Sequence, residues 1–116
     1  MIVPRVKMAH DGCGTAWFLA MHPTNRLDML GWGQLEFDNG RIWLSIFVQP
    51  TWQRQRIGAS ILSHMMCHAD DCSLELSLSS KPHLVDMYKA LGFEAQAMQG
   101  IKAKPGQVLM VREPQT

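Results

Sequence analysis

The sequence predicts one α+β domain with six or seven strands and two main helices. Short segments of alternating or continuous apolar residues, separated by turn signals, predict the strands. Two segments whose apolar residues are spaced by threes and fours predict the helices. The 116 residues suffice for one hydrophobic core but not for two, and no repeat or linker divides them, so residues 1–116 are treated as a single domain.

The first half of the chain is predicted to form four strands. Pro4 restricts the first strand to a sheet edge, because proline cannot donate to a strand ladder. Gly31 and Gly33 in the third strand indicate a bulge or a close backbone approach, and Asp38-Asn39-Gly40 is a strong hairpin turn. The predicted ranges are 2–8, 15–21, 27–37 and 41–48.

The second half is predicted to hold both helices and the remaining strands. The first helix follows Pro50, ends near Asp70 and Asp71, and carries one apolar stripe. The second covers about 82–91, with proline suited to a first turn and Gly92 to the cap. Strands are predicted over 73–78, 94–98 and 107–112, the last two separated by the Pro105-Gly106 turn. The stripe consists of Ile57, Ile61, Leu62, Met65 and Ala69.

Composition argues against several classes of protein. The formal net charge of +1 provides no general field for nucleic acid or an anionic membrane, so any anion site must be local. No apolar run is long enough to span a membrane or to form a secretory signal, and we expect a cytoplasmic protein. The three cysteines have no framework spacing and are expected to be free thiols.

The junction between the strand at 41–48 and the next helix is a candidate anion site. The first N–H groups of a helix have no intrahelical partner and point outward with the positive end of the helix dipole. Arg54 and Arg56 add two permanent charges there, and Gly58 leaves room where a ligand must approach the backbone. These features predict a phosphate-binding loop.

Two ordered motifs resemble those of the GNAT superfamily of N-acetyltransferases. The loop Gln53-Arg54-Gln55-Arg56-Ile57-Gly58, followed by Ala59, resembles the acetyl-CoA signature Gln/Arg-x-x-Gly-x-Gly/Ala, with arginine in place of the first glycine. Downstream, the segment 84–93, LVDMYKALGF, is similar to the Tyr-x-x-x-Gly-Phe helix ending of the family. The resemblance covers roughly residues 15–112 and implies a mixed, mostly antiparallel sheet.

The resemblance implies acetyl-CoA as the acetyl donor, and no metal. The backbone of the strand at 41–48 is expected to pair with the pantetheine amides, while Arg54, Arg56 and the N–H groups of residues 55–59 hold the pyrophosphate. Ser79 or Ser80 stands where the family often has a cofactor-binding asparagine. The expected cofactor-binding residues are Phe47, Val48, Gln53, Arg54, Gln55, Arg56, Ile57, Gly58, Ala59 and Ser80.

The resemblance further implies direct transfer of the acetyl group to a primary amine. An alkyl amine is almost fully protonated at neutral pH, so a base must take its proton before it attacks the thioester. Tyr88 matches the general acid of the family and would protonate the departing thiolate. Glu36 and Glu75 are the candidate bases, each acting through an ordered water, and His83 and Ser45 are further candidates.

The acceptor side departs from the family pattern. Two helices usually lie between the first two strands of the family and wall off the acceptor pocket, whereas only about half a dozen residues join those strands here. We therefore expect an open acceptor side. It favours an exposed lysine or N-terminus of a protein as the acceptor, or a site completed by a second subunit in a homodimer.

Two other classes of function remain open. The arginine in the glycine position and the open acceptor side also fit a noncatalytic binding or regulatory module with the same fold. A nucleic-acid binder would use the arginine loop, but the tryptophans lack interleaved basic residues and are expected in the core or an interface. These are Trp17, Trp32, Trp43 and Trp52. Zinc is not expected at His64, Cys67, His68 and Cys72, which include no Cys-x-x-Cys pair.

Overall fold

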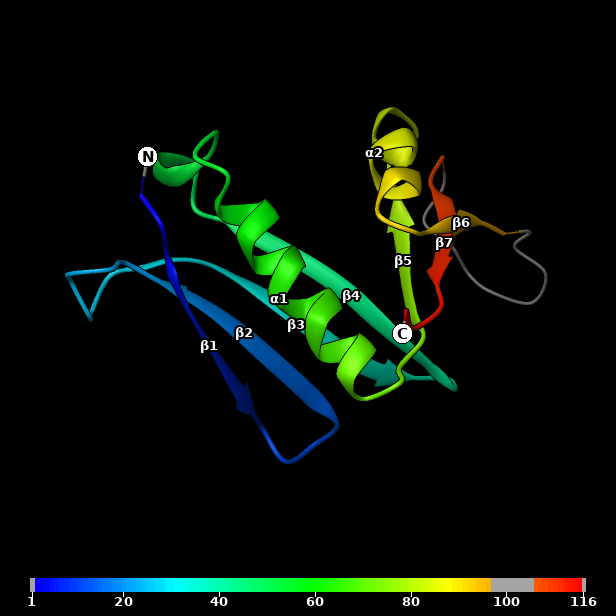
Figure 1. Cartoon of the computed structure of the whole chain (residues 1–116), viewed down its shortest axis with the longest axis horizontal. Coiled ribbons are helices and arrows are strands. Elements are labelled where there is room, and N and C mark those ends of the chain that lie inside the picture. The colour runs from blue at the N-terminus through cyan, green and yellow to red at the C-terminus, as the bar shows by residue number, and fades with distance from the viewer. Residues whose placement is uncertain (1, 97–105, 116) are drawn as a thin grey trace.

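The computed structural model describes residues 2–96 and 106–115 as a seven-stranded sheet with two helices (Figure 1). The strand order is β1-β2-β3-β4-β5-β7-β6, and within these residues only β4 and β5 pair in parallel. The predicted α+β class with a mixed, mostly antiparallel sheet is confirmed. The strands are β1 (Arg5–His10), β2 (Thr15–Met21), β3 (Met29–Asp38), β4 (Arg41–Val48), β5 (Leu76–Ser80), β6 (Glu94–Ala95) and β7 (Val108–Arg112). The helices are α1 (Ile57–Asp71) and α2 (Val85–Ala90), preceded by the short 3-10 helices η1 (Pro50–Trp52) and η2 (Pro82–Leu84).

Two strands in the first half begin later than expected. The strand expected over 2–8 forms as Arg5–His10, because this is the segment whose six residues pair with β2. The strand expected from residue 27 begins at Met29. The Asp28 N–H donates to the Asn25 carbonyl at 3.1 Å, which closes a turn immediately before the strand.

The strand expected over 73–78 forms as Leu76–Ser80, because the end of α1 occupies the preceding residues. Ser73 adopts a left-handed conformation with φ of 55°. The Leu74 N–H donates to the Ala69 carbonyl at 2.8 Å and closes the helix.

The remaining elements also differ from their expected bounds. Of the helix expected over 82–91, the first three residues form η2 and the α-helix covers Val85–Ala90. The strand expected over 94–98 is seen at Glu94–Ala95, and residues 97 and 98 lie outside the described residues, as does Pro105. The final strand begins at Val108, one residue later than expected.

The hairpin turn and the close approach between β3 and β4 form as predicted. In Asp38-Asn39-Gly40 the second and third residues have φ of 51° and 76°, as a type I′ turn requires, and Asp38 pairs with Arg41. A Cβ added at Gly31 would lie 2.5 Å from the Phe47 carbonyl oxygen. The two strands are therefore drawn together at the end that leads into the phosphate loop.

The predicted apolar stripe of α1 is confirmed. Its five residues are buried, and the helix lies against β2, β3 and β4 (Figure 1). Full burial of each large apolar side chain stabilises the fold by about 1.5–3 kcal/mol. Other buried members of this core are Phe18, Leu30, Leu35, Leu44, Leu76, Leu78, Phe93 and Met110.

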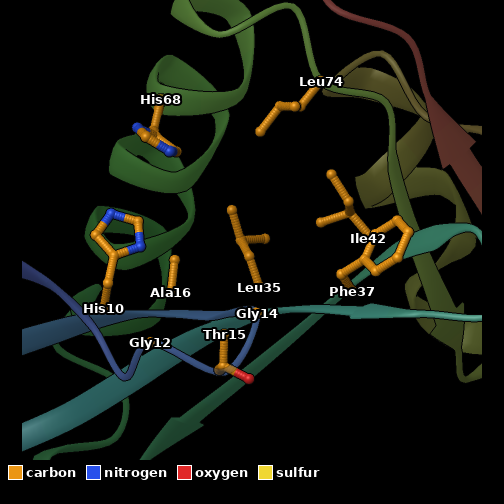
Figure 2. Close-up of a pocket in the computed structure, with 10 residues that line it drawn as sticks. All are labelled: His10, Gly12, Gly14, Thr15, Ala16, Leu35, Phe37, Ile42, His68 and Leu74. Carbon is orange, nitrogen blue, oxygen red and sulfur yellow. The ribbon is translucent and has the colours of Figure 1, made fainter.

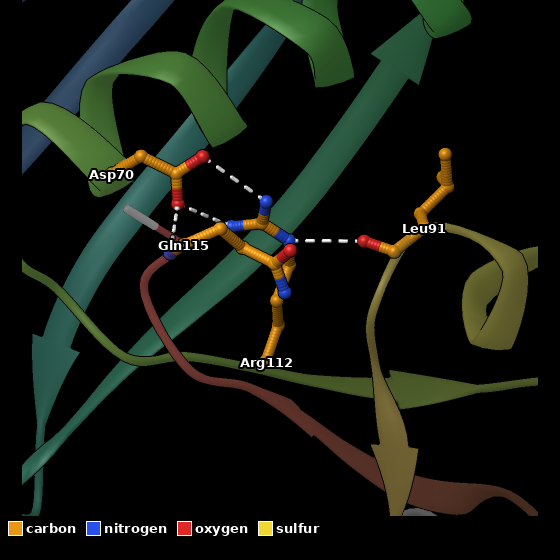
Figure 3. A network of polar contacts seen from close by, with 4 residues as sticks. All are labelled: Asp70, Leu91, Arg112 and Gln115. Carbon is orange, nitrogen blue, oxygen red and sulfur yellow. Dashed lines mark hydrogen bonds and ion pairs between the residues drawn. The ribbon is translucent and has the colours of Figure 1, made fainter.

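A polar network ties β7 to both helices (Figure 3). Arg112 is 5% exposed and donates from Nη1 and Nη2 to the two carboxylate oxygens of Asp70, at 2.8 and 3.1 Å. Its Nε donates to the Leu91 carbonyl, just beyond α2, at 3.0 Å, and the Gln115 N–H donates to Asp70 at 2.9 Å. The hydrogen bonds from Arg112 and then from Gln115 lower the pKa of the Asp70 carboxyl below its ordinary value of 3.8. Because one side chain of β7 reaches both helices, α1 and α2 lie on the same face of the sheet.

The second face of the sheet carries aromatic side chains. Gly33 lies against Ile61 and Met65 of α1, and successive side chains of a strand point to opposite faces, so Trp32 and Glu36 point away from the helix. Cross-strand partners share a face, which adds the neighbours of these residues on β2 and β4. We call this surface the open face and define it by Trp17, Trp32, Glu36, Trp43 and Phe47.

The open face narrows the expectation that the tryptophans lie in the core or an interface. None of the four is in the buried core, and each is half-buried. Trp52 alone packs against the helix-covered core, in η1, where its ring meets His22 in a T-shaped contact at 5.7 Å. The other three, Trp17, Trp32 and Trp43, are on the open face.

Candidate functional site

The loop before α1 leaves the first turn of the helix without internal partners. Arg56, the residue before the helix, makes no side-chain capping bond, and the first turn contains no acidic residue. The first backbone bond of the helix is from the Ser60 N–H to the Arg56 carbonyl, at 3.1 Å. The N–H groups ahead of Ser60 are therefore oriented toward the loop, where an anion would satisfy them.

Arg54 and Arg56 both have left-handed backbone conformations, with φ of 67° and 59°. The left-handed region is the one that glycine adopts readily and that costs other residues about 1–2 kcal/mol. This explains why glycine is the usual residue at the position of Arg56. Both arginines are exposed, so the loop retains two cations at a conformational cost.

The other residues of the loop have different surroundings. Gln53 donates from Nε2 to the Val48 carbonyl at 3.2 Å, which holds the loop against the end of β4. Ile57 is buried, so it offers a ligand its backbone rather than its side chain. Gln55 is half-buried and Ala59 is exposed. An added Cβ at Gly58 would lie 3.6 Å from Val48 Cγ2, so the protein itself leaves room for a methyl group there.

A gap between β4 and β5 adjoins this loop (Figure 1). The two strands pair only at Ile42 with Leu76 and at Trp43 with Ser77, and then diverge. From residue 44 onward, the edge of β4 that faces β5 has no strand partner among the described residues. Phe47 and Val48 lie at the wide end of the gap, where a chain with amide groups would find unpaired backbone.

Tyr88 lies on α2 and is half-buried. Its ring makes a T-shaped contact with Phe93, with centroids 5.5 Å apart. Burial raises the pKa of the Tyr88 phenol above its ordinary value of 10.0, so the hydroxyl is protonated at neutral pH and available as a donor. The phenol therefore has the protonation state that a general acid needs.

The serine hydroxyls at the end of β5 donate within the protein. Ser80 is buried and donates to the Lys81 carbonyl at 2.9 Å. Ser79 donates to Gln107 Oε1 at 2.6 Å. A contact from either hydroxyl to a coenzyme would have to use the oxygen as acceptor.

The two candidate bases lie close to each other in the register of the sheet. Glu75 is exposed and immediately precedes Leu76, which pairs with Ile42. Glu36 is exposed on the open face, opposite Trp43, which pairs with Ser77 where β4 and β5 begin to part. Ser45 is exposed on the same face. Both glutamates are therefore near the closed end of the gap, and both stay candidates.

The aromatic row around Glu36 is a feature that the residue pattern did not reveal. A signal was present, because three consecutive strands each carry one tryptophan. Reading it required the register, which pairs Trp17 with Gln34, Trp32 with Phe47 and Glu36 with Trp43. Strand register cannot be read from periodicity alone.

A separate hollow lies at the far end of α1 (Figure 2). It has a volume of about 390 Å³ and lies between the β1–β2 turn and the last turns of the helix. His10, His68, Leu35 and Phe37 are among the residues that line it. Since a 15-residue helix is about 22 Å long, this hollow is well separated from the phosphate loop and is not part of the site.

The histidines and cysteines of α1 do not form a metal cluster in the part of the chain that the structure describes. Among residues 2–96 and 106–115, no group of three or more His, Cys, Asp and Glu side chains has the arrangement of a metal site. His64 Nδ1 contacts the Ser60 carbonyl at 2.8 Å, and His68 lies 3.9 Å from Cys72 Sγ. No helix in this part of the chain is long and apolar enough to cross a membrane.

Comparison with known proteins agrees with this geometry. Residues 19–111 match the Acetyltransferase (GNAT) domain family. An acyl-CoA N-acyltransferase from Pseudomonas aeruginosa has a TM-score of 0.67 and 19% identity, over 88% of this chain and 73% of that one. A GNAT superfamily phosphinothricin acetyltransferase from Sinorhizobium meliloti, solved in complex with AcCoA, has a TM-score of 0.68 and 20% identity, over 89% and 63%. The ribosomal-protein-S18-alanine N-acetyltransferase from Escherichia coli has a TM-score of 0.68 and 18% identity, over 89% and 71%. A comparison with curated proteins gave no match.

The fold, the gap and the domain match together define an acyl-CoA-dependent N-acyltransferase. Within that class, the chain belongs to the GNAT acetyltransferase family, whose domain spans residues 19–111. The resemblance drawn from two sequence motifs is thereby confirmed.

Proposed function

We propose that the protein transfers the acetyl group of acetyl-CoA to a primary amine by direct attack. The observation that carries the proposal is the uncapped start of α1, beside two exposed arginines and next to the gap between β4 and β5. A diphosphate satisfies both the free N–H groups and the two cations. The unpaired edge of β4 near Phe47 and Val48 would hold the pantetheine amides and direct the thioester into the gap.

In the proposed mechanism, Tyr88 acts as the general acid. The neutral amine attacks the thioester carbonyl, and the phenol donates its proton to the departing sulfur. Glu36 and Glu75, each acting through a water, are the candidate bases near the closed end of the gap. No covalent enzyme intermediate is required. The open face suits an exposed lysine or N-terminus of a protein as well as a small amine.

Calorimetry with acetyl-CoA tests the binding step. Replacing both Arg54 and Arg56 by alanine should weaken affinity at least about 100-fold, because each charge-assisted hydrogen bond contributes about 1.5 kcal/mol or more. Arg26→Ala, which removes an exposed arginine from another loop, is the control and should bind normally. Undiminished affinity in the double variant would refute the phosphate assignment.

Turnover measurements test the proposed role of Tyr88 as the general acid. Tyr88→Phe should lower kcat by about 10²–10⁴-fold while leaving acetyl-CoA affinity unchanged. The product should be followed by mass, because Cys13, Cys67 and Cys72 are free and exposed and would react with a thiol reagent. Equal turnover by the variant would remove Tyr88 from the mechanism.

A second candidate is a noncatalytic module that binds CoA and contacts a partner protein. Two features favour this candidate, which are Arg56 at the usual glycine position and the open face of the sheet. Binding of acetyl-CoA without acetylation of any amine or protein pool would support the module over the enzyme.

A cytoplasmic location and a homodimer are also part of the proposal. Cell fractionation would test the location, and sedimentation would test the oligomeric state.

A further inference from the structure

The open face carries a continuous aromatic row across β2, β3 and β4. The ring centroids of Trp17 and Trp32 are 5.4 Å apart in a T-shaped contact, and those of Trp32 and Phe47 are 5.8 Å apart. Phe47 is 45% exposed, and the tryptophans are half-buried. Both described helices lie on the other face, so these rings present their edges and faces outward beside the gap that would hold the thioester.

Two carboxylates lie beside this row, and one of them, Asp11, already accepts hydrogen bonds from the Cys13 and Thr15 N–H groups and from the Trp17 side chain. The other, Glu36, is exposed, pairs with Trp43 on β4, and accepts a hydrogen bond from Gln34 Nε2 at 3.2 Å, which orients the carboxylate. Trp17 lies opposite Gln34 on β2 and so flanks the same carboxylate diagonally. Indole faces around a carboxylate form a site that favours an alkylammonium ion, through cation–π attraction and a charge-assisted hydrogen bond.

The nearby cations do not neutralise Glu36. Arg41, two residues before Trp43, donates from Nη1 to Ser77 Oγ at 3.2 Å and lies opposite Asp38 in the register. Arg5 and Lys7 on β1 lie opposite Met21 and Leu19, at the other end of the row. In the described structure the one ion pair is that of Arg112 with Asp70, so Glu36 has no cationic side-chain partner there.

We propose that the acceptor is an aliphatic diamine or polyamine, whose second ammonium is bound by Glu36 between Trp43 and Trp17. This inference rests on the proposed acetyl transfer, and it assigns Glu36 to the distal ammonium, which leaves Glu75 as the candidate base. The amine that attacks must be neutral, whereas the site at Glu36 favours a protonated amine, so the two functions need two nitrogens. Ser45 and Phe47 lie two and four residues beyond Trp43, or about 7 and 13 Å along β4. A four-carbon diamine lying on the aromatic row spans the shorter of these distances, and a longer polyamine spans the greater one.

A peptide acceptor fits this face less well. Peptides commonly bind by adding a strand to an unpaired sheet edge, but β2 and β3 are each paired on both sides. Recognition here would depend on side chains alone, which suits a flexible hydrocarbon chain with charged ends. In the reaction, one neutral amine forms the bond to the acetyl carbon and the carbon–sulfur bond breaks. The proton lost by nitrogen is balanced by the proton gained by sulfur.

The test compares 1,4-diaminobutane with butylamine, which has the same chain and one amine fewer. We expect kcat/KM for the diamine to exceed that for butylamine at least tenfold, and Glu36→Gln and Trp43→Leu to bring the ratio close to one. The ratio of the two kcat/KM values does not depend on whether Glu36 also helps to remove a proton, because the attacking nitrogen of either amine loses one proton in the same way. Glu94→Gln, an exposed glutamate on β6, is the matched control and should keep the wild-type ratio.

A binding measurement separates this inference from the proposed enzyme activity. Tryptophan fluorescence of the CoA-bound protein should report the diamine at concentrations about tenfold below butylamine, and Glu36→Gln should abolish the difference. If no amine is acetylated, the proposed function fails, and this titration alone decides the inference. Equal ratios for the two amines, a ratio unaffected by Glu36→Gln, or better turnover of a peptide with a single lysine would each overturn it.

Discussion

The two ends of α1 are treated in opposite ways. At its C-terminal end, Asp70 is held by three hydrogen bonds, two from Arg112 and one from Gln115, and the Leu74 N–H closes the last turn. At its N-terminal end, Arg56 provides no side-chain cap, has a left-handed backbone and is exposed. The polar groups at the C-terminal end are hydrogen-bonded within the protein, whereas the N–H groups at the N-terminal end have no side-chain cap.

The difference separates stability from function within a single helix. A helix start without a capping side chain typically costs about 0.5–2 kcal/mol relative to a capped one. The left-handed arginines add to that cost. A fold under selection for stability alone would place Ser, Asp or Gly here, so the strain supports the anion site that we propose at this end. Substitutions at the C-terminal end should therefore lower stability, whereas those at the N-terminal end should lower affinity.

The largest expected effect on stability is at Arg112. Arg112→Met removes the buried guanidinium and leaves the Leu91 carbonyl and the Asp70 carboxylate without it, so we expect Tm to fall by roughly 10 °C. Below the transition, acetyl-CoA affinity should be unchanged, since the phosphate loop is at the other end of α1. Thermal unfolding and calorimetry measure both, with Arg26→Met as the control. A loss of affinity equal to that of the loop variants would show that the two ends are coupled.

The next largest effect is on how the free energy of unfolding depends on pH, through Asp70. Its folded pKa lies below the ordinary value of 3.8, so the unfolded state binds the proton more readily. The stabilisation is therefore present above pH 3.8 and is lost as the pH falls through the lower folded pKa. Asp70→Asn should be less stable than the wild type at pH 7, and the difference should shrink below pH 3.8. Urea unfolding across this range measures it, with Asp71→Asn, an exposed and adjacent substitution, as the control.

Local sequence signals predicted most of the fold. The apolar stripe of α1, the Asp38-Asn39-Gly40 turn and the close approach at Gly31 each depend on residues that are near in the chain or on a glycine that geometry demands. The start of β5 was misplaced because Ser73 and Leu74 complete the end of α1, and a helix end of this kind has no strong signal without a glycine.

The site was predictable to the extent that it is local. The phosphate loop and Tyr88 lie in short motifs, whereas the open face depends on the register of three strands. The Asp70–Arg112 contact was also missed, because it joins residues 42 positions apart. Sequence alone gave no reason to connect them.

A smaller effect is expected at Arg56. Arg56→Gly should relieve the left-handed strain and stabilise the protein by about 1 kcal/mol. It should also weaken acetyl-CoA binding about tenfold, since one charge-assisted hydrogen bond is lost. Arg56→Ala separates these effects, because it loses the charge but keeps the strain. If the glycine variant were destabilised, the strain argument at this end of α1 would be wrong.

The smallest expected effect on stability is at Gly58, in the first turn of α1. Alanine is the better helix former, and its Cβ has room 3.6 Å from Val48 Cγ2, so Gly58→Ala should stabilise the protein by about 0.5 kcal/mol. Acetyl-CoA affinity should stay the same, because the signature that this loop resembles accepts glycine or alanine at this position and the added Cβ points toward Val48. Thermal unfolding with and without acetyl-CoA measures both, with Ala59→Gly as the reverse change. A variant that bound acetyl-CoA more weakly than the wild type would show that the phosphate oxygens need the space that Gly58 leaves.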